Sequence, residues 1–378
     1  MLKFNNIVLK HVDKWLFPIE TIDWNPYGLP PYTLRVELFP DEVEPLINYD
    51  FRNDKLTMTQ VSASPNIWDI KYTDSIWDSM FELGGPGSNV KGVIGGNLTG
   101  VTSIIEWFYV DHTLEYVNII DTPDVTNMAQ SFYGCDALVN IPKYFNLASV
   151  EDMYRSFGYC YSLVHAPKFV NSSNLRNLSG IFTVCPSLTD IPLFDTSNVV
   201  NFNDMFAYCP SLKEVPNLNT SSAESMFEMF YCTAIEVAPV LDTSNVVEMG
   251  YMFEGCTGLK EVPLYNTQAV TGMEGTFEGC NSIETVPVFD TSNVSCFTYM
   301  FDGCTSLKEV PLFDVSSAAK CAYMFNDTVN VERGSLALYN RLQALGSQIT
   351  SKTDCFKDCG SNTTTGAAEL AQIPSSWK

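Results

Sequence analysis

The feature that most constrains the fold of this chain is a motif of about 24 residues that occurs nine times in succession. One clear copy reads DTSNVVEMGYMFEGCTGLKEVPLY from Asp242 to Tyr265, and another reads DTSNVSCFTYMFDGCTSLKEVPLF from Asp290 to Phe313. A fixed period of this size is typical of a solenoid, in which each copy forms one coil and covers the apolar face of its neighbours. The copies begin at Asp121, Asn146, Asn171, Asp195, Asn219, Asp242, Asn266, Asp290 and Asp314.

Each copy carries a phenylalanine four residues after another apolar residue, as in Met249 and Phe253. Apolar residues at this spacing lie on one face of a helix, so the pattern predicts a short amphipathic helix in every coil. A cysteine recurs two or three residues after the phenylalanine, with the fifth copy one residue short between Phe230 and Cys232. We expect the phenylalanines to form the repeated core, namely Phe132, Phe157, Phe182, Phe206, Phe230, Phe253, Phe277, Phe301 and Phe325.

The remaining parts of each copy predict how the coil closes. The short polar side chains of the D/N-T-S-N segment suit the N-cap of a helix of roughly ten residues. The segment from Leu259 to Pro263 places a β-branched residue before a proline, which favours an extended backbone. The predicted fold class is therefore α/β, with one short strand and one helix per coil. Because strands stack about 4.8 Å apart and helices pack about 8–10 Å apart, we expect a horseshoe with the strands inside.

The repeat resembles the bacterial leucine-rich repeats of the BspA-like type, in the variant of about 25 residues written around F-D-T-S-N-V, M-x-x-M-F and C-x-S-L-x-x-I/V-P. The resemblance covers about Asp121 to Asn326 and departs from the pattern between Asn171 and Cys185. It implies a leucine-rich-repeat-like solenoid. It also implies a binding role, because BspA-like proteins are commonly cell-surface adhesins.

Four regions are expected along the chain. The runs TLRVELF, KLTMTQV and NIWDIKY alternate apolar and polar residues, so residues 1–95 are predicted to form a small β-rich docking domain with an N-terminal arm. Residues 96–120 resemble an N-terminal capping turn, in which Asp111 takes the place of the cysteine. The leucine-rich-repeat solenoid is expected over residues 121–328, and the C-terminal cap over residues 329–378.

Charge and cysteine usage limit the classes of partner. The formal net charge is −23, which argues against nucleic acid as a partner. Eight of the twelve cysteines share one position of the repeat, where we expect small buried thiols, and the sequence leaves disulfide pairing undecided. No close cysteine pair suggests zinc. Capping accounts for Asp195, Asp242 and Asp290 without a calcium ladder, so no metal or cofactor is expected.

Signs of catalysis are sparse, and we expect the chain not to be an enzyme. Its three histidines, His11, His112 and His165, lie in different segments. A cysteine nucleophile needs a base within hydrogen-bond reach, and His165 with Cys160 is the one pair that is close in sequence. The glycine-rich residues 84–100 lack the Lys-Ser/Thr pair of a phosphate-binding loop. Paired acids for glycoside hydrolysis need only proximity in space, so a glycan hydrolase stays an open alternative.

Candidate partner contacts fall in the variable positions inside L-x-x-V-P and just beyond the proline. Extended solenoid surfaces of this kind bind proteins or glycans. The candidates are Lys213, Glu214, Lys260, Glu261, Glu284, Lys308, Glu309 and the aromatic residue Tyr265.

The short β-rich segment joined to the repeats resembles virion-associated fibre or decoration proteins of phages that infect gut bacteria. This resemblance implies a virion structural protein, assembled in the host cytoplasm, that docks to other virion proteins through residues 1–95. The solenoid would then display a binding surface for a host protein or glycan, and a homo-oligomer is expected. Residues 1–18 contain no continuous apolar run before a cleavage site, so we expect no signal peptide and no membrane insertion. A bacterial cell-surface adhesin is the alternative.

Overall fold

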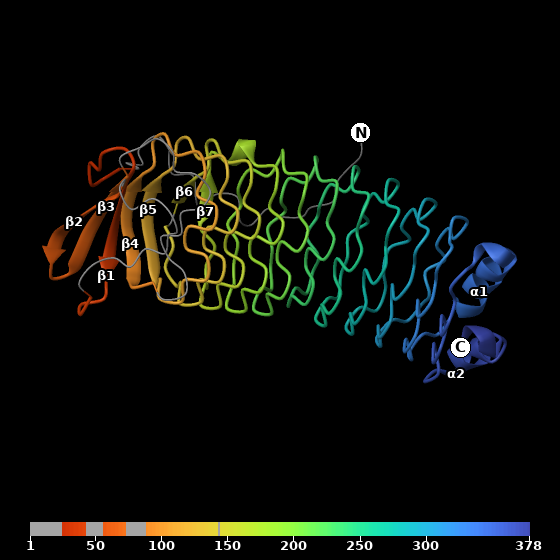
Figure 1. Cartoon of the computed structure of the whole chain (residues 1–378). Helices are drawn as coiled ribbons and strands as arrows, with labels where there is room; N and C mark the ends of the chain where they lie inside the picture. Colours follow the sequence, from red (N-terminus) through yellow and green to blue (C-terminus); the bar gives the residue numbers. More distant parts are fainter. Residues whose placement is uncertain (1–24, 43–55, 73–87, 143) are drawn as a thin grey trace, which may run out of the picture.

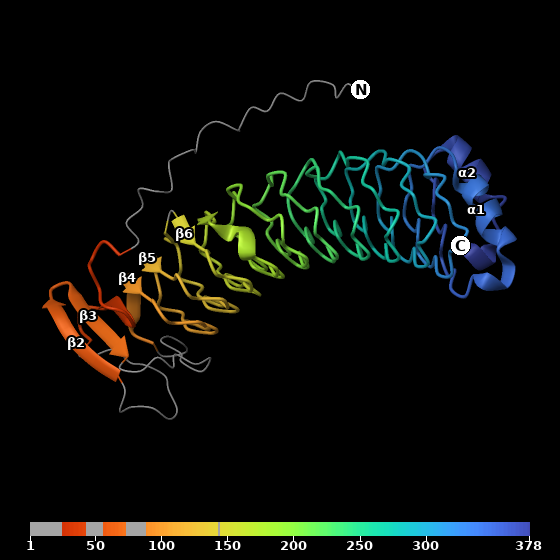
Figure 2. The same cartoon turned by 90° about the horizontal axis from the view of Figure 1, so that it is seen from above.

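The computed structural model describes residues 25–42, 56–72, 88–142 and 144–378. The molecule is an elongated stack of coils that runs from a β-sheet at one end to two helices at the other (Figure 1). Seen from above, the stack follows a gentle arc (Figure 2). One hydrophobic core extends through it, from Leu34 in the sheet to Trp377 near the C-terminus. The predicted N-terminal arm lies outside the described residues.

A five-stranded sheet covers the N-terminal end of the stack. Its strands are β1 (Thr33–Leu38), β2 (Leu56–Ala63), β3 (Asn66–Tyr72), β4 (Val90–Asn97) and β5 (Tyr116–Asp121), in the order β2-β3-β1-β4-β5. The first three strands are the alternating runs from which the sequence predicted β-structure. β1 pairs antiparallel with β3 and β4, whereas β4 pairs parallel with β5.

This sheet is continuous with the solenoid. Strand β4 crosses the domain boundary that the sequence placed at residue 95. Its parallel partner β5 is bridged in turn to the next coil, where Tyr116 pairs with Asn140. The parallel pairing between coils therefore extends into the sheet, and the sheet serves as the cap of the stack.

The predicted helix in each coil is wrong. Between residues 121 and 328, the described part of the chain contains no α-helix and a single 3-10 helix, η3 (Ser172–Asn174). Tight turns replace the helix: the Ser131 amide donates to the Met128 carbonyl at 3.1 Å, within the same coil. The next amide, of Phe132, donates to the Ser156 carbonyl of the following coil at 2.9 Å. Amides thus alternate between bonds within a turn and bonds between coils.

Two left-handed residues per coil interrupt any helix. In the sixth coil these are Tyr251, with φ 56°, and Gly255, with φ 70°. The left-handed conformation costs about 1–2 kcal/mol for a residue with a side chain. Bonds between coils offset this cost, because Tyr251 and Gly255 donate their amides to the Glu274 and Glu278 carbonyls, each at 2.7 Å. The first set of left-handed residues consists of Gln130, Arg155, Gly180, Asp204, Glu228, Tyr251, Gly275, Tyr299 and Tyr323. The second set consists of Gly134, Tyr159, Val184, Tyr208, Cys232, Gly255, Gly279, Gly303 and Asp327.

The D/N-T-S-N segment closes a turn instead of capping a helix. The Asp242 carboxylate accepts the Ser244 amide at 3.0 Å, as the first residue of an Asx turn does. The Thr243 hydroxyl is buried and donates to the Asn266 carbonyl of the next coil at 2.8 Å. The polar residues of the motif therefore set both the turn and the contact between coils.

Short parallel pairings connect neighbouring coils. Strands β6 (Tyr144–Asn146) and β7 (Lys168–Val170) pair in register, and single bridges at other positions of the coils connect neighbours along the stack. Because no helices widen one side of the coils, the stack curves gently (Figure 2) and does not form the predicted horseshoe. The longest line of bridges joins Ser103, Asn127, Asp152, Asn177, Asn201, Ser225, Glu248, Gly272, Cys296, Lys320 and Ser351.

The nine repeat phenylalanines lie buried in one continuous stack. Phe253, for example, lies parallel to Phe230 and Phe277, with ring centroids 5.4 and 5.7 Å apart. The stack extends into both caps, through Phe108 at one end and Phe356 at the other. Each ring thus depends on the coil before and the coil after it.

The C-terminal cap consists of α1 (Ser335–Ala344), η4 (Gly346–Gln348), α2 (Thr364–Leu370) and η5 (Ser375–Trp377). Trp377 is buried, accepts the Phe356 amide through its carbonyl at 2.9 Å and packs edge-on against Tyr339. The last phenylalanine of the stack is therefore covered by the end of the chain. This matches the need of a solenoid for a terminal cap.

Candidate partner-binding face

Residues at equivalent places in successive coils form columns along the stack. One column, which we call the charge column, contains one charged residue per coil and alternates in sign over six consecutive coils. The Lys260 amide donates to the Glu236 carbonyl at 2.8 Å, and the Lys308 amide to the Glu284 carbonyl at 3.0 Å, so the backbone fixes this register. The charge column consists of Lys213, Glu236, Lys260, Glu284, Lys308 and Glu332.

Two charges of this column form an ion pair between neighbouring coils. The Lys260 ammonium lies 2.7 Å from the Glu236 carboxylate. This hydrogen bond, together with the positive charge of Lys260, lowers the pKa of Glu236. Both side chains are more than half exposed, and exposed ion pairs of this kind contribute little to stability. This ion pair therefore adds little to the stability of the stack.

A second column lies beside the first and is less regular. Its residues are Glu214, Val237, Glu261, Thr285, Glu309 and Arg333. The Arg333 guanidinium lies 2.6 Å from the Glu309 carboxylate, and this hydrogen bond lowers the pKa of Glu309. Parallel bridges join Val237 to Glu261 and Glu309 to Arg333, so this column follows the same register as the charge column.

Beyond the proline of each coil, four successive coils expose an aliphatic side chain. We call Val240, Leu264, Val288 and Leu312 the aliphatic column; their exposed fractions are 57, 69, 62 and 39 %. The residue after each of them is buried, as Leu241 and Phe289 show. Because extended backbone sends successive side chains to opposite sides, burial of the one forces exposure of the other. A run of exposed aliphatic side chains is typical of an interaction surface.

The structure separates the predicted contact residues into two groups. Lys213, Glu214, Lys260, Glu261 and Glu284 are exposed, and Lys308 and Glu309 are half-buried, all within the two charged columns. Tyr265 instead is 4 % exposed, and its hydroxyl donates to the Pro239 carbonyl at 2.8 Å. Tyr265 therefore belongs to the core and is no longer a candidate contact residue. Sequence reasoning missed the aliphatic column, although the V-P-L and P-V-F alternation carries its signal.

Another part of the coils carries half-buried carboxyl groups. Burial raises the pKa of Glu228 to about 7, with the neighbouring Asp204 as a second cause. Burial also raises the pKa of Glu278 to about 7, with Glu254 adding to it, and it raises the pKa of Asp302. Asp204 and Glu228 are left-handed residues themselves, whereas Glu278 and Asp302 directly precede the left-handed residues Gly279 and Gly303.

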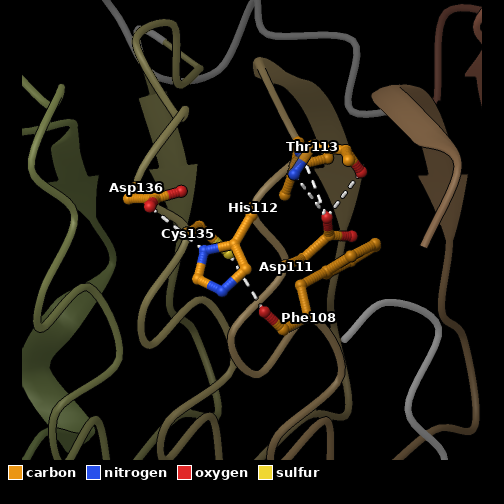
Figure 3. Close-up of polar contacts among 7 residues, drawn as sticks. Phe108, Asp111, His112, Thr113, Cys135 and Asp136 are labelled. Carbon is orange, nitrogen blue, oxygen red and sulfur yellow. Dashed lines mark hydrogen bonds and ion pairs between the residues drawn. The ribbon is translucent and has the colours of Figure 1, made fainter. Parts of the chain in front are cut away.

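The repeated cysteines link each coil to the previous one. The Cys135 thiol donates to the Phe108 carbonyl at 3.0 Å (Figure 3), and Cys160, Cys185, Cys209, Cys256, Cys280 and Cys304 repeat this contact. In the fifth coil, however, Thr233 takes this place and contacts the Cys256 sulfur, whereas Cys232 is one of the left-handed residues. The missing residue of that copy therefore lies after Thr233, and not before Cys232 as the sequence suggested.

In the capping turn before the first coil, Asp111 takes the place of the cysteine, as the sequence predicted. Its carboxylate is fully buried and accepts bonds from the amide and the hydroxyl of Thr113 (Figure 3). Burial raises the pKa of this carboxyl group. Beside it, His112 pairs with Asp136 at 3.1 Å.

The side chains considered for catalysis, Cys160 and His165, each contact a different partner. The Cys160 thiol is fully buried and bonded to the Phe132 carbonyl, and burial raises its pKa well above the ordinary value. His165 pairs instead with Asp190 at 2.5 Å. In the described ranges, no three His, Cys, Asp or Glu side chains gather as metal ligands would. Those ranges also contain no helix with the length and apolar character needed to cross a bilayer. His11 lies outside them.

These features define a repeat solenoid, built from stacked turns and capped at both ends, with exposed charged and aliphatic side chains in register along successive coils. Residues 102–212, 167–239 and 239–337 match the family described as Mycoplasma protein of unknown function, DUF285. The matches together span more than half of the 378 residues, and the chain belongs to this family.

Two of the three chains of solved structures that match this protein are leucine-rich proteins. One is a leucine-rich repeat protein from Eubacterium ventriosum, with 18 % identity over 73 % of this chain and 84 % of that chain, at a TM-score of 0.41. The other is a leucine-rich cell surface protein from Faecalibacterium prausnitzii, with 15 % identity over 79 % of this chain and 98 % of that chain, at a TM-score of 0.29. None of the curated proteins matches the chain. Neither structure is described as a phage protein, and the expected relationship to phage fibres gains no support.

Proposed function

We propose that this chain is a non-enzymatic binding module of a bacterial cell surface, and that it contacts its partners through the charge column and the aliphatic column. The observation that carries the proposal is the row of Val240, Leu264, Val288 and Leu312, which are exposed on four successive coils and each follow a charge of alternating sign by four residues. Exposed aliphatic side chains gain free energy when a partner covers them, and the neighbouring charges select the partner.

The rigidity of the stack suits this role. Bonds between coils, such as Phe253 to Thr276 at 3.0 Å, hold the columns in fixed register without a bound partner. A preformed face loses little conformational entropy on binding. Because Cys160 and His165 are already engaged with Phe132 and Asp190, binding explains the described residues better than catalysis.

The cell-surface location rests on the resemblance of the repeat to the BspA-like type. A virion fibre that displays the same face to a host is the alternative location. A glycan hydrolase is the alternative activity, and the release of new reducing ends from purified capsule by the wild-type chain would favour it.

The experiment measures binding of fluorescently labelled full-length protein to intact bacterial cells and to cultured epithelial cells by flow cytometry. We expect the double variant Leu264→Asp/Val288→Asp to lose at least tenfold in binding to the cell type that the wild type binds. Val247→Asp is the matched control, because Val247 is a 47 % exposed aliphatic residue outside both columns. Equal binding by the double variant and the wild type would show that the contact face is elsewhere.

A further inference from the structure

The binding face has an internal symmetry that points to one partner. Reversing the order of the charge column converts the series Lys, Glu, Lys, Glu, Lys, Glu into Glu, Lys, Glu, Lys, Glu, Lys. An alternating series with an even number of members is therefore complementary to itself when two copies run in opposite directions. We propose that this face binds a second copy of the same chain, antiparallel, about a two-fold axis that crosses the face between Leu264 and Val288.

The geometry of face-to-face packing selects this axis. A two-fold axis in the interface and perpendicular to the stack reverses the direction of the coils but keeps each column opposite itself. The charge column then meets the charge column, and the aliphatic column meets the aliphatic column. An axis along the stack would instead place the charge column against the aliphatic column, which leaves charged groups desolvated without partners.

The charge column fits this axis at every coil. With the axis between the sixth and seventh coils, Lys260 faces Glu284 of the second copy and Glu236 faces Lys308. At the outer coils, Lys213 faces Glu332. No lysine of this column meets a lysine, and no glutamate meets a glutamate.

The aliphatic column has the same centre, although it is made of different residues. Its four members are Val240, Leu264, Val288 and Leu312. Reversal about their midpoint pairs Val240 with Leu312 and Leu264 with Val288. The apolar contacts therefore lie at the middle of the proposed interface, where water is best excluded, and the outermost charges form its edge.

The second charged column places no two like charges opposite each other under this operation. Glu214 faces Arg333, Glu261 faces Thr285, and Glu309 faces Val237. A column rich in glutamate would repel itself in most registers, because like charges at short range cost free energy. Three columns of different chemistry thus agree on one axis.

This inference rests on the proposed function for the choice of face, and sedimentation velocity of the full-length protein tests it separately. We expect a concentration-dependent dimer. Lys260→Glu places two glutamates opposite each other and should raise the dissociation constant at least tenfold, and Glu284→Lys should do the same with two lysines. The swap Lys260→Glu/Glu284→Lys restores opposite charges across the axis and should return the constant to within about threefold of the wild type. Val247→Asp is again the control.

Cross-linking tests the direction of the two copies. A mixture of the single variants Val240→Cys and Leu312→Cys should form a disulfide-linked dimer on mild oxidation, whereas each variant alone should not. Each chain in the mixture carries only one of the two introduced cysteines, so a disulfide between them joins two chains. Linkage of Val240→Cys to itself would show that the two-fold axis does not lie between Leu264 and Val288, and would overturn the proposal.

The two proposals fail in different ways. A wild type that stays monomeric at 100 μM, or a charge swap that fails to restore the dimer, overturns the second copy as the partner. If Leu264→Asp/Val288→Asp still abolishes binding to cells in that case, the face binds a different protein and the proposed function stands. If instead the wild type dimerises as expected but Leu264→Asp/Val288→Asp binds cells as well as the wild type does, the dimer stands and the proposed function is wrong.

Discussion

The thiol of Cys280 donates a hydrogen bond to the carbonyl oxygen of Phe253, one coil earlier, at 3.1 Å. Both residues are buried, and six other cysteines make the same contact in their own coils. The cysteine position of the repeat therefore serves cohesion between coils. Burial raises the pKa of the Cys280 thiol well above its ordinary value, so thiolate chemistry is suppressed there.

Removing this thiol should weaken the stack. We expect Cys280→Ala to lower the free energy of unfolding by about 1–2 kcal/mol, because the Phe253 carbonyl loses its partner and a small cavity opens. Urea denaturation followed by circular dichroism measures the effect. Cys296→Ala is the control, since Cys296 is only half-buried and bonds no carbonyl of the phenylalanine stack. An equal loss in both variants would refute a role in joining coils.

The phenylalanine stack should set the cooperativity of unfolding. Phe253→Ala removes a fully buried ring between two stacked neighbours, and we expect it to cost about 3–5 kcal/mol. Because each coil contacts only its neighbours, hydrogen exchange should accelerate first in the coils around Phe253. Phe227→Ala, at a half-buried ring of the preceding coil, should cost less. Uniform acceleration along the whole chain would contradict a stack of coupled coils.

The left-handed residues offer a matched pair of backbone tests. Val184 and Gly279 hold equivalent places, with φ 56° and 69°. Val184→Gly should stabilise the protein by about 1 kcal/mol, because glycine adopts this conformation without steric cost. Gly279→Val should destabilise it by about 1–2 kcal/mol, since a Cβ there has room, 3.7 Å from the nearest atoms, and only the conformation is penalised. Melting temperatures that shift in the same direction for both variants would refute this explanation.

Half-buried carboxyl groups should make stability depend on pH. The pKa of Glu278 is raised to about 7 in the folded chain, mainly by burial, so the folded state binds a proton more tightly than the unfolded state. The stability from this group is fully present below its unfolded pKa near 4.5 and is lost as the pH rises towards 7.

Glu278→Gln should therefore flatten the decline of the melting temperature between pH 4.5 and pH 7.5, by about 1–2 °C. Differential scanning calorimetry at several pH values measures it. The exposed Glu224→Gln is the control and should keep the wild-type slope. A slope that is unchanged in Glu278→Gln would remove this group as a source of the pH dependence.

Much of the fold follows from the sequence because the period and the apolar positions of the repeat indicate how the coils pack. The period predicts stacked coils, and residues such as Phe253 and Phe301 can face only a shared core, since one coil cannot bury them alone. The polar residues from Asp242 to Asn245 were expected to cap a helix, whereas in the structure they close a turn. The aliphatic column was within reach of the same reasoning, through the alternation around each proline.

What the sequence could not decide is where each backbone amide donates. Met249 and Phe253, four residues apart, bury both side chains equally well in a helix or in a series of turns. Only the neighbouring coil, which accepts amides such as that of Tyr251, makes the turns more favourable than the helix. A contact between coils also explains why Tyr265 is buried, because its hydroxyl donates to the Pro239 carbonyl one coil away. The sequence determined the period and the core. Contacts between coils, which no single copy contains, determined the backbone within each coil and which side chains stay exposed on its surface.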